Sequence, residues 1–287
     1  MIRTKNKNQK KTLRKGPPEK NHEKKASFKY PEGHLRWMAF IDKGGFLRLK
    51  KIDAELSAIS CKTNFLAINP KNIESERKMV EEDENYNPQF EYRPYEHDLD
   101  SMEDYLESIS QQDSYMGRIL EEKRKEYIQF CRLFKARGYS GFTKHSINIY
   151  GLPKEELCEK AKPTLECKEI DIKKNITTEN ALDLLRAELF HYGFGYSVEA
   201  KQMSSSAAVL VSQRKIFLKK GQLFSRHYIN RLIFHEIGTH VLRAENGKRQ
   251  PFKVFHYGLP HYLGTEEGLA VVNEERFGLL NPKVLKI

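Results

Sequence analysis

Six consecutive residues near the C-terminus, His235–His240 (HEIGTH), place two imidazoles and a carboxylate on one short segment. Two histidines, an adjacent glutamate and a carboxylate from further along the chain are the groups with which many zinc peptidases build their site. In that chemistry the histidines bind the metal and the adjacent glutamate takes a proton from water. The pattern predicts a Zn²⁺ site with His235 and His240 as ligands and Glu236 as general base.

The spacing of the two histidines is unusual, because they are five residues apart instead of the four of the common H-E-x-x-H motif. On an α-helix, positions four apart differ in direction by roughly 40°, whereas positions five apart differ by roughly 140° and lie on different faces. A single π-type turn would bring both imidazoles to one side. Because Gly238 eases an irregular turn, the sequence predicts a distorted helix there, or else histidines with only a structural or surface role.

The flanking segments predict one helix before the motif and another after it. Ser225 can cap an amphipathic helix that runs to Phe234, and Thr265 can cap a helix with Glu267 in its first turn. Glu267 follows His240 by 27 residues and suits a third zinc ligand on a separate helix.

Several runs of this sequence resemble the microtubule-associated tyrosine carboxypeptidases, whose bacterial relatives are described by a QEGLA motif. This family also has five-residue histidine spacing. The resemblance extends with gaps from Leu56 to Phe277, and its N-terminal part is supportive only. The similar runs are His235–Arg243, Asn246–Phe252 and Thr265–Ala270, with Ile68–Glu76 and Tyr86–Tyr92 in the N-terminal half.

The resemblance implies a zinc carboxypeptidase that removes a C-terminal residue from a peptide or protein tail. Characterised eukaryotic members remove tyrosine from α-tubulin, so an aromatic terminal residue is expected. By position, the resemblance makes His235, His240 and Glu267 the ligands and Glu236 the general base. Glu266 competes for the third position, but the family pattern, in which glutamate precedes Gly-Leu-Ala, favours Glu267. The chain ends 20 residues after Glu267, where family members usually continue, so we expect a compact or shortened member.

A carboxypeptidase also needs a cation for the substrate α-carboxylate and a donor for the tetrahedral oxyanion. Arg249, which we favour, and Arg243 lie close in sequence to the metal-binding helix. Each candidate side chain has an alternative structural or surface role. The candidate oxyanion donors are Tyr257, Tyr262, His256 and His261.

Two other functions are compatible with the same residues. One is a zinc endopeptidase or aminopeptidase on the same scaffold. The other is a catalytically inactive module that binds a polyanion through its basic N-terminal tail. Residues 1–27 contain ten Lys and Arg against Glu19 and Glu23, so they carry +8 of the net charge of +11. Such a segment is expected to be disordered, and it either binds an acidic protein surface or another polyanion or is an idle solvated extension.

The remaining composition indicates a cytoplasmic protein. The N-terminus lacks the apolar segment of a secretory signal, and no apolar run is long enough to span a bilayer. The four cysteines lie far apart and predict free thiols instead of a disulfide framework. They are Cys61, Cys131, Cys158 and Cys167.

The elements that must position these groups predict an α+β, zincin-like metallopeptidase, mostly helical with a small sheet beside the metal-binding helix. We expect this domain over residues 28–287, with a helical part (28–140) and a zinc-site part (141–287). Helices are predicted over 34–63 with an interruption at Gly44–Gly45, over 98–135, and over 178–192 with Thr178 as cap and Gly193 at the end. Residues 70–94 read as an extended loop. Strands are predicted over 144–150, 196–200, 207–212 and 214–219, the last two as a hairpin.

Overall fold

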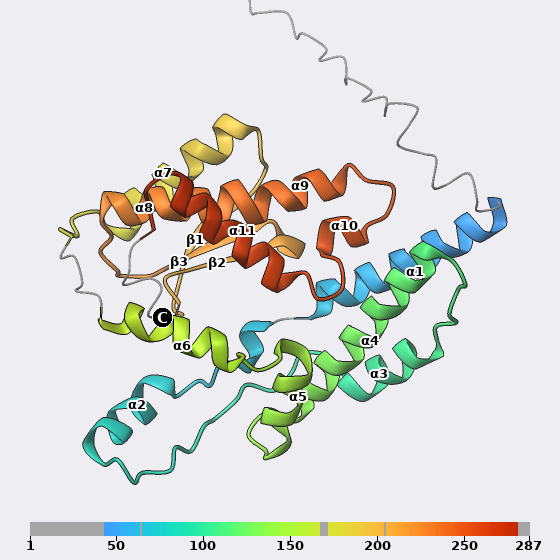
Figure 1. Ribbon diagram of the computed structural model, residues 1–287, viewed down its shortest axis with the longest axis horizontal. Coiled ribbons are helices and arrows are strands. Elements are labelled where there is room, and N and C mark those ends of the chain that lie inside the picture. The colour runs from blue at the N-terminus through green and yellow to red at the C-terminus, as the bar shows by residue number, and fades with distance from the viewer. Residues whose placement is uncertain (1–42, 64, 167–171, 204, 281–287) are drawn as a thin grey trace, which may run out of the picture. The chain divides into compact units, whose positions relative to one another are not determined.

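A computed structural model describes residues 43–63, 65–166, 172–203 and 205–280 (Figure 1). All of these residues belong to one compact unit. The basic tail predicted over residues 1–27 and the start of the first predicted helix, residues 34–42, lie outside the described residues.

The N-terminal half of the described chain is helical and is organised around α4 (Tyr115–Lys135). Leu120, Leu133 and Phe134 of α4 are almost fully buried, and α1, α3 and α5 pack against this helix. The other helices are α1 (Lys43–Lys62), η2 (Phe65–Ile68), α2 (Ile73–Glu82), α3 (Leu99–Ser108), α5 (Gly141–Tyr150) and α6 (Glu155–Glu166). α1 runs through Gly44 and Gly45 without the predicted interruption.

The helical region expected over 98–135 is confirmed and comprises α3 and α4. Two other predictions in this half were wrong. The segment 70–94, expected as an extended loop, contains α2. Residues 144–150, expected as a strand, belong to α5. Their apolar alternation suggested a strand, but the covered positions of α5 are 141, 142, 145, 146 and 149. That is the helical period, and it is set by packing against α4.

The C-terminal half contains the small sheet and the helices of the site. It comprises α7 (Thr178–Tyr192), β1 (Ser197–Lys201), β2 (Ala207–Leu210), η3 (Val211–Gln213), β3 (Lys215–Lys219), α8 (Arg226–Leu232), η4 (Ile233–Val241), α9 (Leu242–Lys248), α10 (Val254–Tyr257) and α11 (Leu263–Arg276). α8, η4 and α9 follow one another as one continuous helical rod, and α11 packs alongside it (Figure 1).

The three strands form one sheet in the order β1-β3-β2. β1 is parallel to β3, with Ser197 opposite Lys215, and β2 is antiparallel to β3, with Ala207 opposite Leu218. The predicted hairpin is therefore confirmed, and β2 is an edge strand that contacts η4. The expectation of a mostly helical α+β protein with a small sheet beside the histidine-bearing helix is also confirmed.

One hydrophobic cluster connects α7, the sheet and the histidine-bearing helix. Leu185 of α7, Ile216 and Leu218 of β3, and Ile229 and Ile237 of the rod are all fully buried in it. Burying these side chains together fixes the rod against the sheet, since each large aliphatic side chain contributes about 1.5–3 kcal/mol when it is removed from water. The packing thus determines which side of the rod faces the sheet.

The helix starts agree with the sequence only in part. The Ser225 hydroxyl accepts a hydrogen bond from the Tyr228 N–H at 3.1 Å, so the predicted cap of α8 is confirmed. The cap of α7 is Thr177 instead of Thr178, whose buried hydroxyl donates to backbone carbonyls of Lys219 and Gln222. α11 begins at Leu263, so Thr265 is not its cap.

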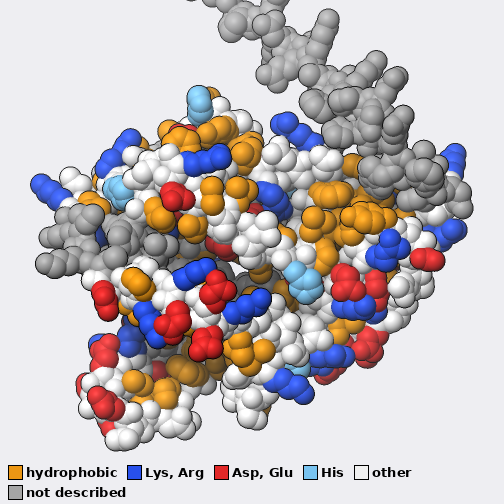
Figure 2. Space-filling view, in the orientation of Figure 1, with side chains coloured by type: hydrophobic (Ala, Val, Ile, Leu, Met, Phe, Trp, Pro, Cys, Tyr) orange, Lys and Arg blue, Asp and Glu red, His pale blue; other side chains and the backbone are white. Residues whose placement is uncertain are grey.

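α1 is connected to the site half through a buried carboxylate. Asp53 accepts hydrogen bonds from the N–H groups of Lys253 (2.6 Å) and Val254 (2.8 Å) at the start of α10. On the face shown in Figure 2, acidic and basic side chains are interspersed. Within the described part of the chain, no helix is long and apolar enough to cross a bilayer.

Candidate metal centre

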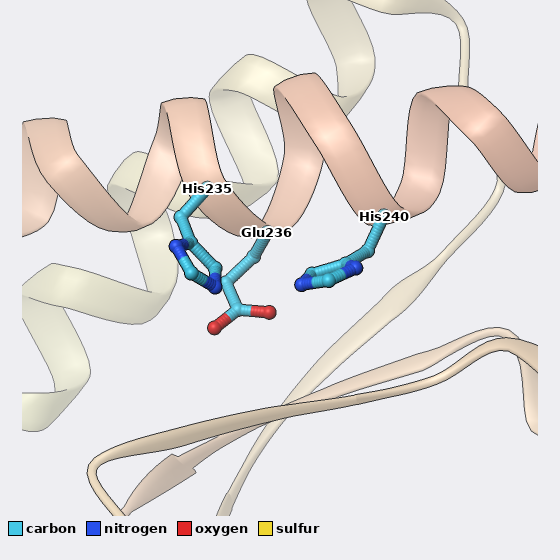
Figure 3. A group of neighbouring side chains, drawn as sticks. All are labelled: His235, Glu236 and His240. Carbon is cyan, nitrogen blue, oxygen red and sulfur yellow. The ribbon is translucent and has the colours of Figure 1, made fainter. Parts of the chain in front are cut away.

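The helix that carries both histidines is a π-helix, η4, from Ile233 to Val241. Its wider turns bring positions five apart onto the same side, as a single metal site requires. The imidazole rings of His235 and His240 have their centroids 5.1 Å apart. Figure 3 shows both rings on one side of the helix with the Glu236 carboxylate between them. The predicted distortion around Gly238 is confirmed, and it extends over nine residues.

Side chains from η4 and α11 hold the widened helix. The Thr239 hydroxyl donates to the carbonyl of Phe234, five residues earlier, at 3.1 Å. Asn273 of α11 donates its side-chain N–H to the same hydroxyl at 2.9 Å. The rings of Phe234 and Phe277 stack with centroids 3.9 Å apart. These contacts couple the π-helix to α11, and the sequence motif contained no sign of them.

Gly238 contributes less than expected. A Cβ added there would have the Ile233 carbonyl oxygen, at 3.6 Å, as its nearest neighbour, which is ordinary van der Waals contact. Gly238 also does not have a positive φ. The widened turn therefore does not require glycine at this position on steric grounds.

Both histidines face one carboxylate across the gap between η4 and α11. Nε2 of His235 lies 3.4 Å from Oε2 of Glu267, and Nε2 of His240 lies 3.5 Å from Oε1 of the same residue. His235, Glu236 and His240 also offer ligand atoms within 4.8 Å of one another. Two imidazoles and two carboxylates thus converge on one point, which is the donor set of a transition-metal site.

The outer nitrogen of each imidazole is occupied by a buried carboxylate. Nδ1 of His235 donates to Oε1 of Glu274 at 2.6 Å, and Nδ1 of His240 lies 3.2 Å from Oε1 of Glu266. Metal-binding histidines commonly use their second nitrogen in this way, which leaves Nε2 as the ligand atom. Glu274 was missed by sequence reasoning, although it follows Glu267 by seven residues, two helical turns, on the same face of α11.

Two arginines neutralise these supporting carboxylates. Arg231 Nε donates to Glu274 at 2.9 Å, and Arg243 Nε donates to Glu266 at 2.9 Å. Arg243 also donates to the backbone carbonyl of His256. Charge-assisted hydrogen bonds of this kind orient the carboxylates toward the histidines.

The charges of the cluster shift the pKa of its members. Burial lowers the pKa of His235, but hydrogen bonds to Glu267 and Glu274 outweigh it and raise the pKa to about 9. The same opposition raises the pKa of His240, with Glu266 as its main partner. Burial raises the pKa of Glu236 and outweighs the opposing charges of His235 and His240. The carboxylates around His235 and His240 thus stabilise positive charge on the two imidazoles.

The histidines open into a cavity of about 330 Å³ between α11, η4 and the edge strand β2. Three of its residues come from β2 and a fourth, Val211, follows directly. Arg243 and Tyr262 are the predicted substrate-binding and oxyanion candidates that lie in its wall. The lining residues are Ala207, Ala208, Val209, Val211, His235, Glu236, His240, Arg243, Tyr262, Leu263, Glu266 and Glu267.

The other candidates lie elsewhere. Arg249 is exposed at the end of α9 and does not line the cavity. The Tyr257 hydroxyl donates to Asp53 at 3.3 Å, and His256 Nδ1 donates to the carbonyl of Ala244 at 2.8 Å. The backbone N–H of His261 is bound by Glu126. Of the predicted substrate-binding and oxyanion residues, the structure brings only Arg243 and Tyr262 to the histidines.

Comparison with known proteins shows to which family this chain belongs. The family model described as "Microtubule-associated tyrosine carboxypeptidase" matches residues 77–286. Microtubule-associated tyrosine carboxypeptidase 1 from Mus musculus is 26% identical over 251 residues, which is 82% of this chain and 47% of the mouse protein. The chain thus spans about half the length of this relative. No solved structure matches the present chain. The chain belongs to the microtubule-associated tyrosine carboxypeptidase family.

Proposed function

We propose that this protein is a zinc-dependent carboxypeptidase with a zincin-like site, and that it removes a C-terminal, Tyr-like aromatic residue from a peptide or protein tail. The observation that carries the proposal is the approach of two Nε2 atoms, at 3.4 and 3.5 Å, to the two oxygens of Glu267. Family membership supports the reaction type, and the geometry supports the metal.

The residues fit a zinc ion. His235, His240 and Glu267 would hold it, because their ligand atoms converge and each Nδ1 is already bound by a carboxylate. When bound, zinc would supply Lewis-acid chemistry, polarising a carbonyl and acidifying water. Glu274 and Glu266 bind the Nδ1 atoms and so keep both imidazoles in the tautomer that leaves Nε2 free to bind the metal.

Glu236 is the proposed general base. Its carboxylate lies between the two imidazoles and is 9% exposed, and burial raises its pKa. A carboxylate with a raised pKa is a stronger proton acceptor, so it can take a proton from water and pass it to the leaving amine.

The cavity wall suggests how a peptide tail would bind. β2 is the edge of the sheet, so its outer edge could pair with an extended substrate backbone as an added strand. Apolar side chains of Ala207, Val209 and Leu263 line the space beside it and suit an aromatic terminal residue. Arg243 is the proposed carboxylate partner, although it already pairs with Glu266, and Tyr262 is the proposed hydroxyl donor.

The name of the mouse relative associates that protein with microtubules. For the present chain, a cytoplasmic location and binding of an acidic protein surface by the basic tail are parts of the same proposal.

The test combines metal analysis with a peptide panel. The panel contains one sequence with a terminal Tyr, Phe, Ala or Glu, and each peptide also with an amidated C-terminus and with a blocked N-terminus. We expect one zinc per chain and release of the terminal aromatic residue only from free C-termini, with N-terminal blocking irrelevant. Glu236→Gln should abolish release, whereas the exposed control Glu275→Gln should not.

Other outcomes assign other functions. Cleavage of amidated peptides would indicate an endopeptidase, and inhibition by N-terminal blocking would indicate an aminopeptidase. Polyanion binding that is lost on deletion of residues 1–27, without hydrolysis of any peptide, would favour the inactive binding module. Absence of zinc from the purified, metal-supplied protein would refute the proposal.

A further inference from the structure

Lys123 and Glu126 of α4 form an ion pair buried behind the cavity wall. Nζ of Lys123 lies 2.6 Å from Oε2 of Glu126, and the two side chains are only 3% and 4% exposed. A buried ion pair is weak evidence for stability, because desolvation offsets most of the attraction. The backbone groups that Lys123 and Glu126 bind are therefore more informative than the attraction between the two side chains.

The pair holds the turn that leads into α11. Nζ of Lys123 lies 3.5 Å from the carbonyl oxygen of Leu259, and the free oxygen of Glu126 accepts the backbone N–H of His261 at 3.1 Å. His261 has a φ of 56°, which is unfavourable for a residue with a side chain. The Glu126 hydrogen bond thus stabilises a strained residue directly before Tyr262, the first residue flanking α11.

The ring of Tyr262 is held from several directions. Nζ of Lys123 lies 5.3 Å and Cζ of Arg243 lies 5.0 Å from its centroid, both within cation–π range. On another side the ring packs against Gly258, where an added Cβ would lie 2.3 Å from Cε1 of Tyr262. Gly258 also has a φ of 107°, a backbone conformation that glycine adopts readily. Both this conformation and the lack of a side chain therefore allow the ring to pack here.

Lys123 itself is enclosed by aromatic rings. Its Nζ lies 5.1 Å from the ring centroid of Tyr127 and 6.0 Å from that of Tyr257, in addition to Tyr262. Tyr262 alone of the three lines the cavity, and its hydroxyl makes no hydrogen bond to any described residue. These contacts fix the ring at the cavity wall, and no hydrogen bond to a described residue engages its hydroxyl.

We infer that Lys123 and Glu126 are positioning residues that hold Tyr262 so that its hydroxyl donates a hydrogen bond to the peptide substrate. This inference rests on the proposed function. Tyr262 is the group that touches the substrate, and the ion pair acts through it from a helix 136 or more positions away in the sequence. A donor held rigidly before the reaction is more effective than one that must be ordered during it.

The first test is a double-mutant cycle between the pair and the hydroxyl. Lys123→Met combined with Glu126→Gln removes both charges together and keeps an oxygen for the His261 N–H. With the peptide panel, Tyr262→Phe should lower kcat about 100-fold, and the pair variant about tenfold. The pair variant should cause no further loss in the Tyr262→Phe background. Independent losses that multiply would overturn the inference.

The matched control is the ion pair of Lys125 and Glu122 on the same helix, 2.8 Å apart and about half exposed. Lys125→Met combined with Glu122→Gln should leave kcat and KM unchanged. If the buried pair variant does not fold, Glu126→Gln alone takes its place, because it weakens the hold on Lys123 and keeps the acceptor. The same absence of further loss in the Tyr262→Phe background is expected.

A second measurement does not depend on peptidase activity. Protein labelled with ¹³Cζ-tyrosine gives 14 resonances, and the one missing in Tyr262→Phe belongs to Tyr262. In metal-free protein this resonance should shift in the buried pair variant and stay in place in the exposed control. An unshifted resonance would refute the positioning role even if the enzyme is active. A shifted resonance in a protein that hydrolyses no peptide would refute the proposed function instead.

Discussion

Glu274 and His235 form the shortest hydrogen bond between side chains of the candidate metal centre, 2.6 Å from Oε1 to Nδ1. Glu274 is fully buried on α11, and its second oxygen accepts from Arg231 at 2.9 Å. The histidine therefore cannot rotate without breaking a charge-assisted bond, and its Nε2 is held toward Glu267.

This relationship predicts the effect of Glu274→Gln on metal affinity. The amide keeps the shape of the side chain but removes the charge that orients the imidazole and raises its basicity. We expect zinc affinity to fall about 10–100-fold, measured by competition with a chromogenic chelator. The neighbouring exposed variant Glu275→Gln is the control. Equal affinity in the two variants would contradict the supporting role of Glu274.

The assignment of roles to Glu236 and Glu267 predicts opposite effects on zinc content. Glu267→Gln should release zinc, because its oxygens face both Nε2 atoms. Glu236→Gln should retain one zinc per chain and lose only turnover. Both variants can be compared by elemental analysis after dialysis against a weak chelator. Zinc retained in Glu267→Gln and lost in Glu236→Gln would exchange the two roles.

Two glycines near the metal helix should respond differently to alanine. At Gly238 the added Cβ meets only ordinary contacts, so Gly238→Ala should bind zinc and raise the free energy of unfolding by about 0.5–1 kcal/mol. At Gly247 the Cβ would lie 1.8 Å from the Phe255 carbonyl oxygen, so Gly247→Ala should be destabilised by about 1–3 kcal/mol or more. Urea unfolding measures both. Loss of zinc binding in Gly238→Ala would show that the π-helix needs glycine.

Glu103 predicts a pH-dependent contribution away from the metal centre. Its oxygens lie 2.7 Å from Arg132 Nε and 2.6 Å from Lys135 Nζ. Burial acts to raise its pKa, but the hydrogen bonds to the two cations outweigh it and hold the pKa below the ordinary 4.5. The unfolded chain thus binds more protons in acid, so the stabilisation is complete above pH 4.5 and is lost as the pH falls through the folded pKa.

Glu103→Gln should therefore reduce the free energy of unfolding by about 1 kcal/mol at neutral pH. The difference from the unmodified protein should shrink steadily below pH 4.5. Chemical unfolding of both proteins across this range measures it. A difference that stays constant into acid would mean that the ion pairs contribute nothing.

The histidine-bearing helix η4 shows how far the sequence alone can predict this structure. Two histidines five apart can share a metal only on a widened or interrupted helix. If both bind one ion, their spacing therefore predicts a distorted helix such as the π-helix. The cap at Ser225 and the β2–β3 hairpin were predictable for the same reason. Each depends on residues that are close in sequence, and local geometry determines them.

Predictions that depended on distant contacts were less successful. Residues 144–150 alternate like a strand, yet they form a helix because α4 offers a surface for helical packing and no strand lies beside them in the described sheet. Thr265 has the chemistry of a helix cap, but α11 starts before it, where Glu126 of α4 binds the turn at His261. Tertiary contacts outweighed local preference in both places.

What the sequence by itself determined is the set of candidate reactive groups and the distortion of the helix that carries the histidines. Only the tertiary structure decided which distant groups support them: Glu274 and Glu266 behind the imidazoles, and Arg243 instead of Arg249 in the cavity wall. The physical reason is that spacing along the chain sets directions within one helix. The relative placement of two helices depends on the side chains packed between them, and these come from every part of the chain.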